Sequence, residues 1–240
     1  QYINQLNAGK HVATNTAIER IDTELFVCVD SDDYLSDNAV EIVLEKYKNR
    51  SINDILGIYF RRIHKDGSNV AGEYPENVKS TGITELYHRY GFTGDTMMVL
   101  LTKYLKAVRF PVFAGEKFVT ERVLYNKLDR IAPMLLQEDG IYISEYLDDG
   151  YTRNAHKLAI KNPYGSSAAF LSESFYGCSF TYKVKNYAQY LAFRDLFTLD
   201  DLKFSEFRKP NALIRMAACL FKMRYKRLYR LIYDEIEANK

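Results

Sequence analysis

The chain has 240 residues and a net charge of +2, and 47% of its residues are hydrophobic. This length and this apolar fraction provide for one sizeable core or two modest ones, and they exclude a chain that is disordered by composition. A net charge so close to zero gives no ground for nucleic-acid binding, and the sequence contains no nucleic-acid-binding motif.

The first predicted elements enclose an acidic loop. Apolar residues at helical spacing predict a helix over residues 11–21. A nearly continuous apolar run over 24–29 predicts a strand that is buried on both faces, as in a parallel or mixed sheet. The acidic loop follows at 30–33, and Asp37 is then the expected N-cap of a helix that runs to about Lys48.

Short strands and short helices alternate through the middle of the chain. A strand is predicted at 55–63, within the stretch 52–64, and further strands are predicted at 96–101 and 141–147. The predicted helices are 84–90 and 120–128, and turns are expected at 64–67 and 148–150. The apolar run at 96–101 also suits a buried helix. This alternation predicts an α/β fold in which helices flank a mixed sheet.

Helical patterns dominate the end of the chain. The predicted helices are 164–176, 184–197 and 210–236. We therefore expect an α/β domain over residues 1–162 and a helical region over residues 163–240.

The cysteines and the hydropathy of the sequence indicate in which cellular compartment the protein is expected. Three widely spaced cysteines, an odd number, argue against a disulfide framework and for a reducing compartment such as the cytoplasm. No Cys-x-x-Cys pair is present, and no apolar run approaches the ~18 residues of a membrane-spanning helix. The chain has no secretory signal and begins with glutamine, so we expect it to be a fragment of a longer protein.

The acidic loop is the first candidate site. Asp30, Asp32 and Asp33 directly follow the predicted strand, and open α/β folds bind their ligands where strands end. Two carboxylates in an Asp-x-Asp spacing suit Mg²⁺ or Mn²⁺, which take one or two such ligands and leave other positions to substrate phosphates. The alternative is a solvated loop between a strand and a helix.

The loop belongs to a longer pattern. Residues 7–43, NAGKHVATNTAIERIDTELFVCVDSDDYLSDNAVEIV, resemble glycosyltransferase family 2, whose members have the GT-A fold. The matching parts are the Asn-x-Gly-Lys segment, the Ala-x-Asn of the following helix and the Asp-x-Asp-Asp loop, which here are Asn7, Gly9, Lys10, Ala13, Asn15, Asp30, Asp32 and Asp33. Residues 115–128 and 145–154 are similar to segments of bacterial members that build surface polysaccharide.

The resemblance implies transfer of a sugar from a nucleotide-diphosphate sugar, with Mn²⁺ or Mg²⁺ neutralising the diphosphate leaving group. It implies Asp32 as the metal ligand, with Asp30 sharing the metal or contacting the ribose. The implied donor-binding residues are Asn7, Gly9, Lys10, Asn15, Asp30, Asp33 and Arg153. The two basic candidates also have purely structural interpretations. Lys10 suits an exposed position beside a glycine turn, and Arg153 suits a surface position.

Inversion by direct displacement, the family's reaction, requires a carboxylate base for the acceptor hydroxyl. The family places an acidic residue at the start of a helix after the donor site, where Glu121 matches best and Glu116 second. Glu121 is also an acid that the helix dipole favours in the first turn. Asp148 and Asp149 most simply form a turn.

One part of the family pattern is missing from the sequence. Members usually open with an apolar strand and a second strand ending in Asp-Asp-Gly-Ser, which contact the nucleotide base. We therefore expect a GT-A-like domain that is N-terminally incomplete, with an exposed sheet edge if nothing precedes Gln1. Whether this chain is active alone stays open.

The end of the chain is basic. Between residues 203 and 233 nine residues are basic and one, Glu206, is acidic. A basic stripe at helical spacing consists of Arg215, Lys222, Lys226 and Arg230, together with Cys219. Such a helix suits an anionic membrane surface, here the inner face of the plasma membrane, and a glycan or lipid-linked acceptor. The alternative is a packed helix with a solvated basic face.

Two other functions stay open. A phosphohydrolase of the haloacid-dehalogenase kind also places Asp-x-Asp after an apolar strand, but its motif has Thr or Val where this chain has Tyr34. A non-catalytic, membrane-associated scaffold with a degenerate transferase domain is the third interpretation.

Overall fold

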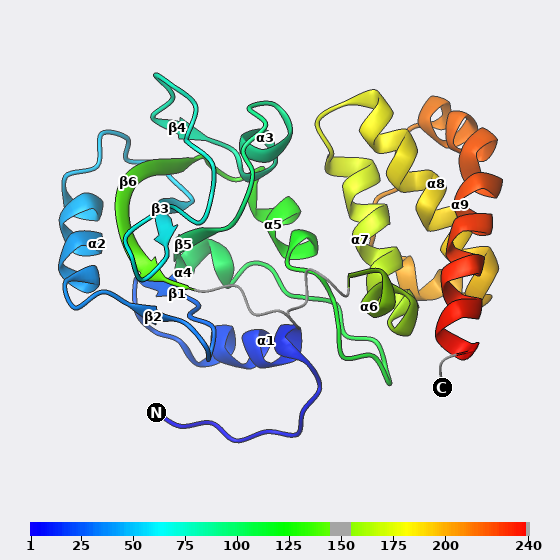
Figure 1. Ribbon diagram of the computed structural model, residues 1–240, viewed down its shortest axis with the longest axis horizontal. Helices are drawn as coiled ribbons and strands as arrows, with labels where there is room; N and C mark the ends of the chain where they lie inside the picture. Colours follow the sequence, from blue (N-terminus) through cyan, green and yellow to red (C-terminus); the bar gives the residue numbers. More distant parts are fainter. Residues whose placement is uncertain (145–154, 239–240) are drawn as a thin grey trace. The chain divides into compact units, whose positions relative to one another are not determined.

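The computed structural model describes residues 1–144 and 155–238 (Figure 1). The chain divides into two compact units, each of which is described by itself. The helical unit comprises Gln1–Glu19, Arg109–Asn126 and Asp148–Lys240, and the sheet unit comprises Arg20–Val108 and Lys127–Leu147. The predicted domain boundary at residue 162 stays a prediction.

A mixed sheet forms the centre of the sheet unit. Its strands in the described residues are β1 (Leu25–Val27), β2 (Tyr34–Leu35), β3 (Gly57–Ile63), β4 (Ser80–Thr81), β5 (Thr96–Leu101) and β6 (Met134–Ile143). They are ordered β1-β5-β3-β6-β2, with β4 also paired to β6. The β3–β6 pair is parallel and the other pairs are antiparallel, which confirms the predicted mixed sheet.

Helices accompany this sheet. They are α2 (Ala39–Lys48), α3 (Ile83–His88), α4 (Thr102–Leu105) and the end of α5 (Arg122–Leu128). Ile42, Val43 and Tyr47 recur at helical spacing along α2, and this face packs against the core that Ile58 and Phe60 of β3 help to form. Periodicity in the sequence therefore fixes which side of α2 faces the sheet.

The helical unit contains longer helices. They are α1 (Lys10–Arg20, whose last residue belongs to the sheet unit), α6 (Ala155–Lys161), α7 (Pro163–Tyr176), α8 (Phe180–Phe197), the 3-10 helix η1 (Asp201–Phe204) and α9 (Ala212–Ala238). Helix α8 packs against both α7 and α9. Aromatic rings join these helices, because the Phe193 and Tyr229 centroids lie 4.6 Å apart in an edge-to-face arrangement. Within the described residues, no helix is both long and apolar enough to span a bilayer.

Three predictions about local structure were wrong. The strand expected over 24–29 is only Leu25–Val27 and is half-buried, because among the described strands β1 lies at the end of the sheet and pairs only with β5. Helix α2 begins after Asn38 rather than Asp37, and Asn38 makes no side-chain capping hydrogen bond. The strand expected at 141–147 begins earlier, at Met134, and its register against β3 shifts at a bulge.

Candidate functional site

The acidic loop lies in the sheet unit and forms a tight turn between β1 and β2. The Asp33 N–H donates to the Asp30 carbonyl over 3.1 Å, which places Ser31 and Asp32 at the tip of the turn. Asp32 is exposed, whereas the Asp33 side chain is only 8% exposed. The three carboxylates therefore have different surroundings, although the sequence presents them as one cluster.

Tyr142 of β6 holds both ends of this turn. Its hydroxyl donates to Asp33 Oδ2 over 2.8 Å and accepts the backbone N–H of Asp30 over 3.0 Å. Burial raises the pKa of the Asp33 carboxyl, and the Tyr142 hydrogen bond and the Arg62 charge oppose that rise. Asp33 is thus the anchor of the loop.

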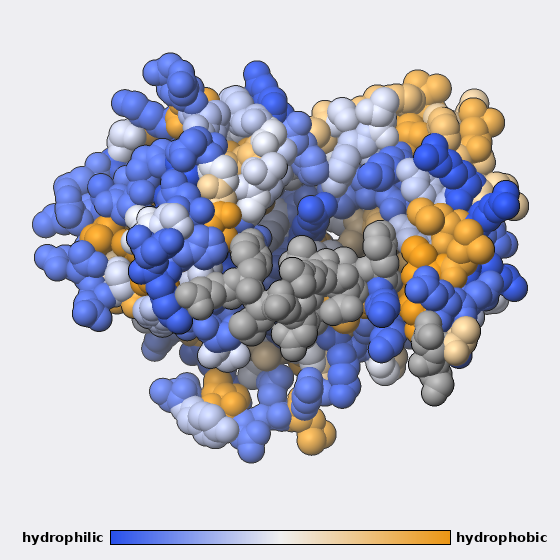
Figure 2. All heavy atoms as spheres, in the orientation of Figure 1, coloured by the Kyte–Doolittle hydropathy of each residue, from blue (hydrophilic) through white to orange (hydrophobic). Residues whose placement is uncertain are grey.

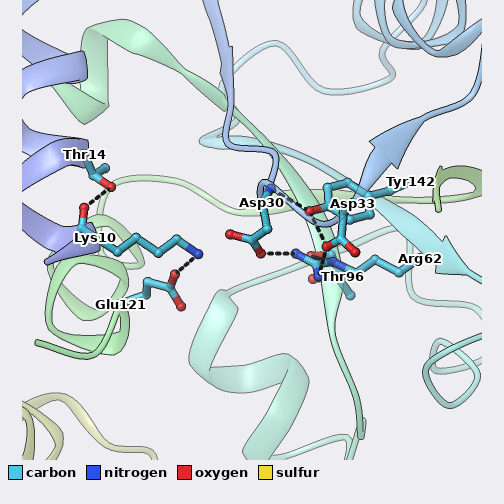
Figure 3. Close-up of polar contacts among 8 residues, drawn as sticks. All are labelled: Lys10, Thr14, Asp30, Asp33, Arg62, Thr96, Glu121 and Tyr142. Atoms are coloured by element: carbon cyan, nitrogen blue, oxygen red, sulfur yellow. Dashed lines mark hydrogen bonds and ion pairs between the residues drawn. The ribbon is translucent and has the colours of Figure 1, made fainter. Parts of the chain in front are cut away.

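Arg62 of β3 supplies a cation between two of the carboxylates (Figure 3). Its guanidinium nitrogens lie 3.5 Å from Asp33 Oδ2 and 3.8 Å from Asp30 Oδ2. The same group stacks 4.1 Å from the centre of the Tyr142 ring, and its Nε donates to the Thr96 carbonyl over 3.3 Å. Arg62 and Tyr142 therefore fix the directions of Asp30 and Asp33.

The exposure and the partners of the three carboxylates determine which of them could bind a cation. In the described part of the chain, no group of three or more His, Cys, Asp or Glu side chains is arranged to hold a metal ion. Mg²⁺ and Mn²⁺ at nucleotide sites need only one or two carboxylates, because phosphates and waters complete the shell. Asp32, exposed at the tip, and Asp30, whose side chain is 31% exposed, fit this type of site.

The helical unit contains the Asn-x-Gly-Lys turn that begins α1. The Asn7 side-chain oxygen accepts the Gly9 N–H over 3.2 Å. Gly9 has φ +94°, and a Cβ there would lie 2.0 Å from the Lys117 carbonyl oxygen. Only glycine is compatible with this conformation and this close approach.

Asn15, the last residue of the predicted donor-binding pattern on α1, pairs with the backbone of Phe110. Its amide nitrogen donates to the Phe110 carbonyl, and its oxygen accepts the Phe110 N–H, both over 3.0 Å. The side chain therefore ties α1 to the segment that precedes α5. Its predicted contact with the donor stays a prediction.

Lys10 and Glu121 form an ion pair in the helical unit (Figure 3). Lys10 Nζ lies 2.8 Å from Glu121 Oε1, and both side chains are about half exposed. The Glu121 carbonyl accepts the N–H groups of Leu124 and Tyr125, so the residue stands at the N-terminal end of α5, as predicted. Two candidate residues more than one hundred positions apart are thus brought together.

Glu116 has a different environment. It is 9% exposed, and its two carboxylate oxygens accept the N–H groups of Tyr164 and Gly165, each over 2.7 Å. These amides belong to the first turn of α7, so Glu116 satisfies groups that a helix start leaves unpaired. Burial raises the pKa of the Glu116 carboxyl, and the two backbone hydrogen bonds oppose the rise.

Some candidates lie outside the described residues, and two important residues were missed. Arg153, Asp148 and Asp149 fall within residues 145–154, of which the structure gives no description. Arg62 and Tyr142 were not predicted from the sequence. A usable signal was present, because two consecutive arginines at 61–62 interrupt an otherwise apolar strand.

Comparisons with known proteins give a matching family and similar solved structures. The family described as Glycosyl transferase family 2 matches residues 1–109. The crystal structure of S. aureus TarS 1-349 in complex with UDP-GlcNAc is similar with a TM-score of 0.50 and 14% identity, covering 84% of this chain and 57% of that one. The structure of S. aureus TarS 1-349 is similar with a TM-score of 0.48 and 15% identity, covering 84% and 55%.

The chain thus spans little more than half of the TarS structures. The mixed sheet, flanking helices and helical end agree with the GT-A-like fold class that the sequence predicts. No curated protein matches this chain.

Proposed function

We propose that the protein is a metal-dependent, inverting glycosyltransferase, because residues 1–109 match the family described as Glycosyl transferase family 2. It moves a sugar from a nucleotide-diphosphate sugar to a glycan or lipid-linked acceptor in bacterial surface polysaccharide synthesis. The observation that carries the proposal is the acidic loop, in which Tyr142 and Arg62 hold Asp33 and Asp30 while Asp32 stays exposed. The similar TarS structure, which contains UDP-GlcNAc, supports a nucleotide sugar as the donor.

In this proposal the acidic loop provides the metal-binding residues. Asp32 is the first ligand and Asp30 shares the metal or contacts the ribose. When bound, Mn²⁺ or Mg²⁺ neutralises the charge that develops on the diphosphate leaving group. Asp33 does not bind the metal, because its carboxylate is held by Tyr142 and Arg62.

The proposed base stands at the N-terminal end of α5. Glu121 accepts the proton of the acceptor hydroxyl as the acceptor oxygen bonds to the anomeric carbon and the bond to the diphosphate breaks. Lys10 directs the Glu121 carboxylate through their ion pair, and with Asn7 and Gly9 it completes the donor-binding turn. We propose Glu121 ahead of Glu116, because both Glu116 oxygens already accept backbone N–H groups.

The proposal also includes a location and a domain division. Three widely spaced cysteines, an odd number, argue for a reducing compartment, and we propose the cytoplasm with peripheral association at the inner face of the plasma membrane. We keep the division into a transferase domain over 1–162 and a helical region over 163–240 as part of the proposal.

Thermal melting with UDP or GDP, with and without Mn²⁺, tests the proposal. Ligands that bind only the folded state stabilise it by about 2.7 kcal/mol at one hundred times Kd. We expect a rise in Tm only when nucleotide and metal are both present. A chain that melts at the same temperature under all these conditions would favour the non-catalytic scaffold.

A further inference from the structure

The outer side of α9 carries apolar side chains that are largely exposed. The inner side contributes Ile214, Ala218 and Tyr229 to the core of the helical unit. The exposed apolar side chains on the other side are Leu213, Met216, Leu220, Met223 and Leu231, with exposed fractions of 61–81%. Their spacing of three, four, three and eight residues places them on one stripe of the helix.

Arginines lie within and beside this stripe. Arg227 lies four residues after Met223 and four before Leu231, and Arg224 lies four after Leu220, so both belong to the same side of the helix. Both are exposed. We call these two arginines and the five apolar residues of the stripe the outer face of α9. Figure 2 shows apolar and hydrophilic side chains interspersed over this helix.

This face differs from the basic stripe that the sequence predicts. Lys222 of that stripe is turned toward α8, where its Nζ lies 2.5 Å from Asp195 Oδ2, and Lys226 is half-buried. Part of the predicted basic stripe therefore packs within the helical unit and is not fully exposed. The outer face combines apolar side chains with a smaller number of arginines.

The charges of the outer face favour an anionic occupant. Acidic residues on α9 begin only at Asp234, near its C-terminal end. In a symmetric pair of outer faces, arginines would face arginines, which disfavours a second copy. A helix that lies in a membrane interface places leucine and methionine side chains at the acyl boundary and extends arginines to the lipid phosphates. The outer face of α9 has side chains of these kinds. Residues 213–231 give it a length of about 27 Å.

We infer that the outer face of α9 binds the headgroup layer of an anionic lipid membrane, with the helix axis in the membrane plane. This contact rests on the peripheral membrane location in the proposed function, and it adds the surface of the protein and the lipid that the surface binds. It requires neither a donor nor a metal, so vesicle binding and the nucleotide-dependent rise in Tm can fail independently.

A single tryptophan provides the first test, because the natural sequence has none. In Leu220→Trp the new indole lies in the outer face, and its emission should shift to the blue on addition of vesicles of phosphatidylcholine mixed with phosphatidylglycerol. The matched control is Leu202→Trp in η1, since Leu202 is 79% exposed and lies outside α9. We expect no shift for the control.

The arginines provide the second test. Arg224→Gln combined with Arg227→Gln should weaken binding to the anionic vesicles, by about fivefold for each arginine. The matched control combines Arg130→Gln with Lys185→Gln, which removes the same charge from exposed positions elsewhere, and should bind as the natural chain does.

Three results would overturn the inference. The first is the absence of a Leu220→Trp shift in a chain whose circular dichroism is unchanged. The second is equal binding to pure phosphatidylcholine vesicles. The third is a dimer in analytical ultracentrifugation that Leu220→Ser dissociates, which would assign the outer face to a second copy.

Discussion

Asp32 and Asp33 are neighbours in the sequence, but their surroundings predict that substitutions will change the free energy of unfolding by different amounts. Asp33→Ala removes the acceptor of the Tyr142 hydroxyl and the anion beside Arg62, which should cost about 1–3 kcal/mol of unfolding free energy. Asp32→Ala changes an exposed side chain and should stay within about 0.5 kcal/mol. Urea unfolding of both variants measures the difference. Equal losses would contradict the assignment of Asp33 as the anchor.

Substitutions at Asp32 and Asp33 also distinguish an effect on folding from an effect on ligand binding. Asp32→Ala should keep its fold but lose the joint effect of nucleotide and Mn²⁺ on Tm, because the proposed first metal ligand is gone. Persistence of the joint effect in this variant would exclude Asp32 as the metal ligand.

Glu121→Gln addresses the proposed base. The amide cannot take the acceptor proton, so turnover should fall by about 10²–10⁴ while donor binding stays normal. The lost ion pair with Lys10 is half exposed and should change stability by at most about 1 kcal/mol. Donor affinity measured by calorimetry, beside the rate of sugar transfer, separates the two effects. Normal turnover would reject the role.

His11 predicts how stability depends on pH. Its ring is 2% exposed, and neither ring nitrogen has a hydrogen-bond partner among the described residues. Burial lowers the pKa of His11 below its ordinary 6.5, so below that pH the unfolded chain binds the additional proton and stability falls. Urea unfolding at about pH 7.5 and about pH 5.5 should show a larger loss for the natural chain than for His11→Leu. Equal losses would exclude His11 as the cause.

At the scale of elements, the start of α7 depends on one distant carboxylate. Glu116→Ala leaves the Tyr164 and Gly165 N–H groups without their partner and should cost about 1–3 kcal/mol. Glu116→Gln retains one acceptor oxygen and should cost less. Urea unfolding ranks the two, with Glu121→Ala as the matched control at an exposed helix start. A cost for Glu116→Ala no greater than the control's would show that α7 does not need this cap.

Elements were predictable where a helical pattern continues over several turns. The helices expected at 164–176, 184–197 and 210–236 are observed as α7, α8 and α9 with small changes at their ends. The first half of β6 was missed because its middle, Gln137 to Gly140, is polar and lies at a bulge, where alternation is interrupted. Local patterns also could not show that Tyr142 and Arg62 meet the acidic loop, since pairing between distant strands brings them there.

At the scale of the whole molecule, the two units interleave along the chain. The helical unit takes three separate stretches and the sheet unit takes two. A change of pattern along the sequence marks a single point, so it does not reveal that each unit takes more than one stretch of the chain. The ion pair between Lys10 and Glu121 shows the consequence, because the two residues come from different stretches of one unit.

The charge of the whole chain is also unevenly distributed, and this gives a last prediction. Residues 203–233 hold nine of the 33 basic residues and one of the 31 acidic residues, which leaves 24 basic and 30 acidic residues elsewhere. An anionic membrane therefore attracts the region of α9 and repels the remainder, and salt screens both effects over a Debye length of about 10 Å at 0.1 M. Raising the salt concentration should weaken binding to the anionic vesicles for the natural chain. Vesicle flotation measures this binding. The variant with Arg224→Gln and Arg227→Gln should depend less on salt, and an equal dependence would show that other charges carry the attraction.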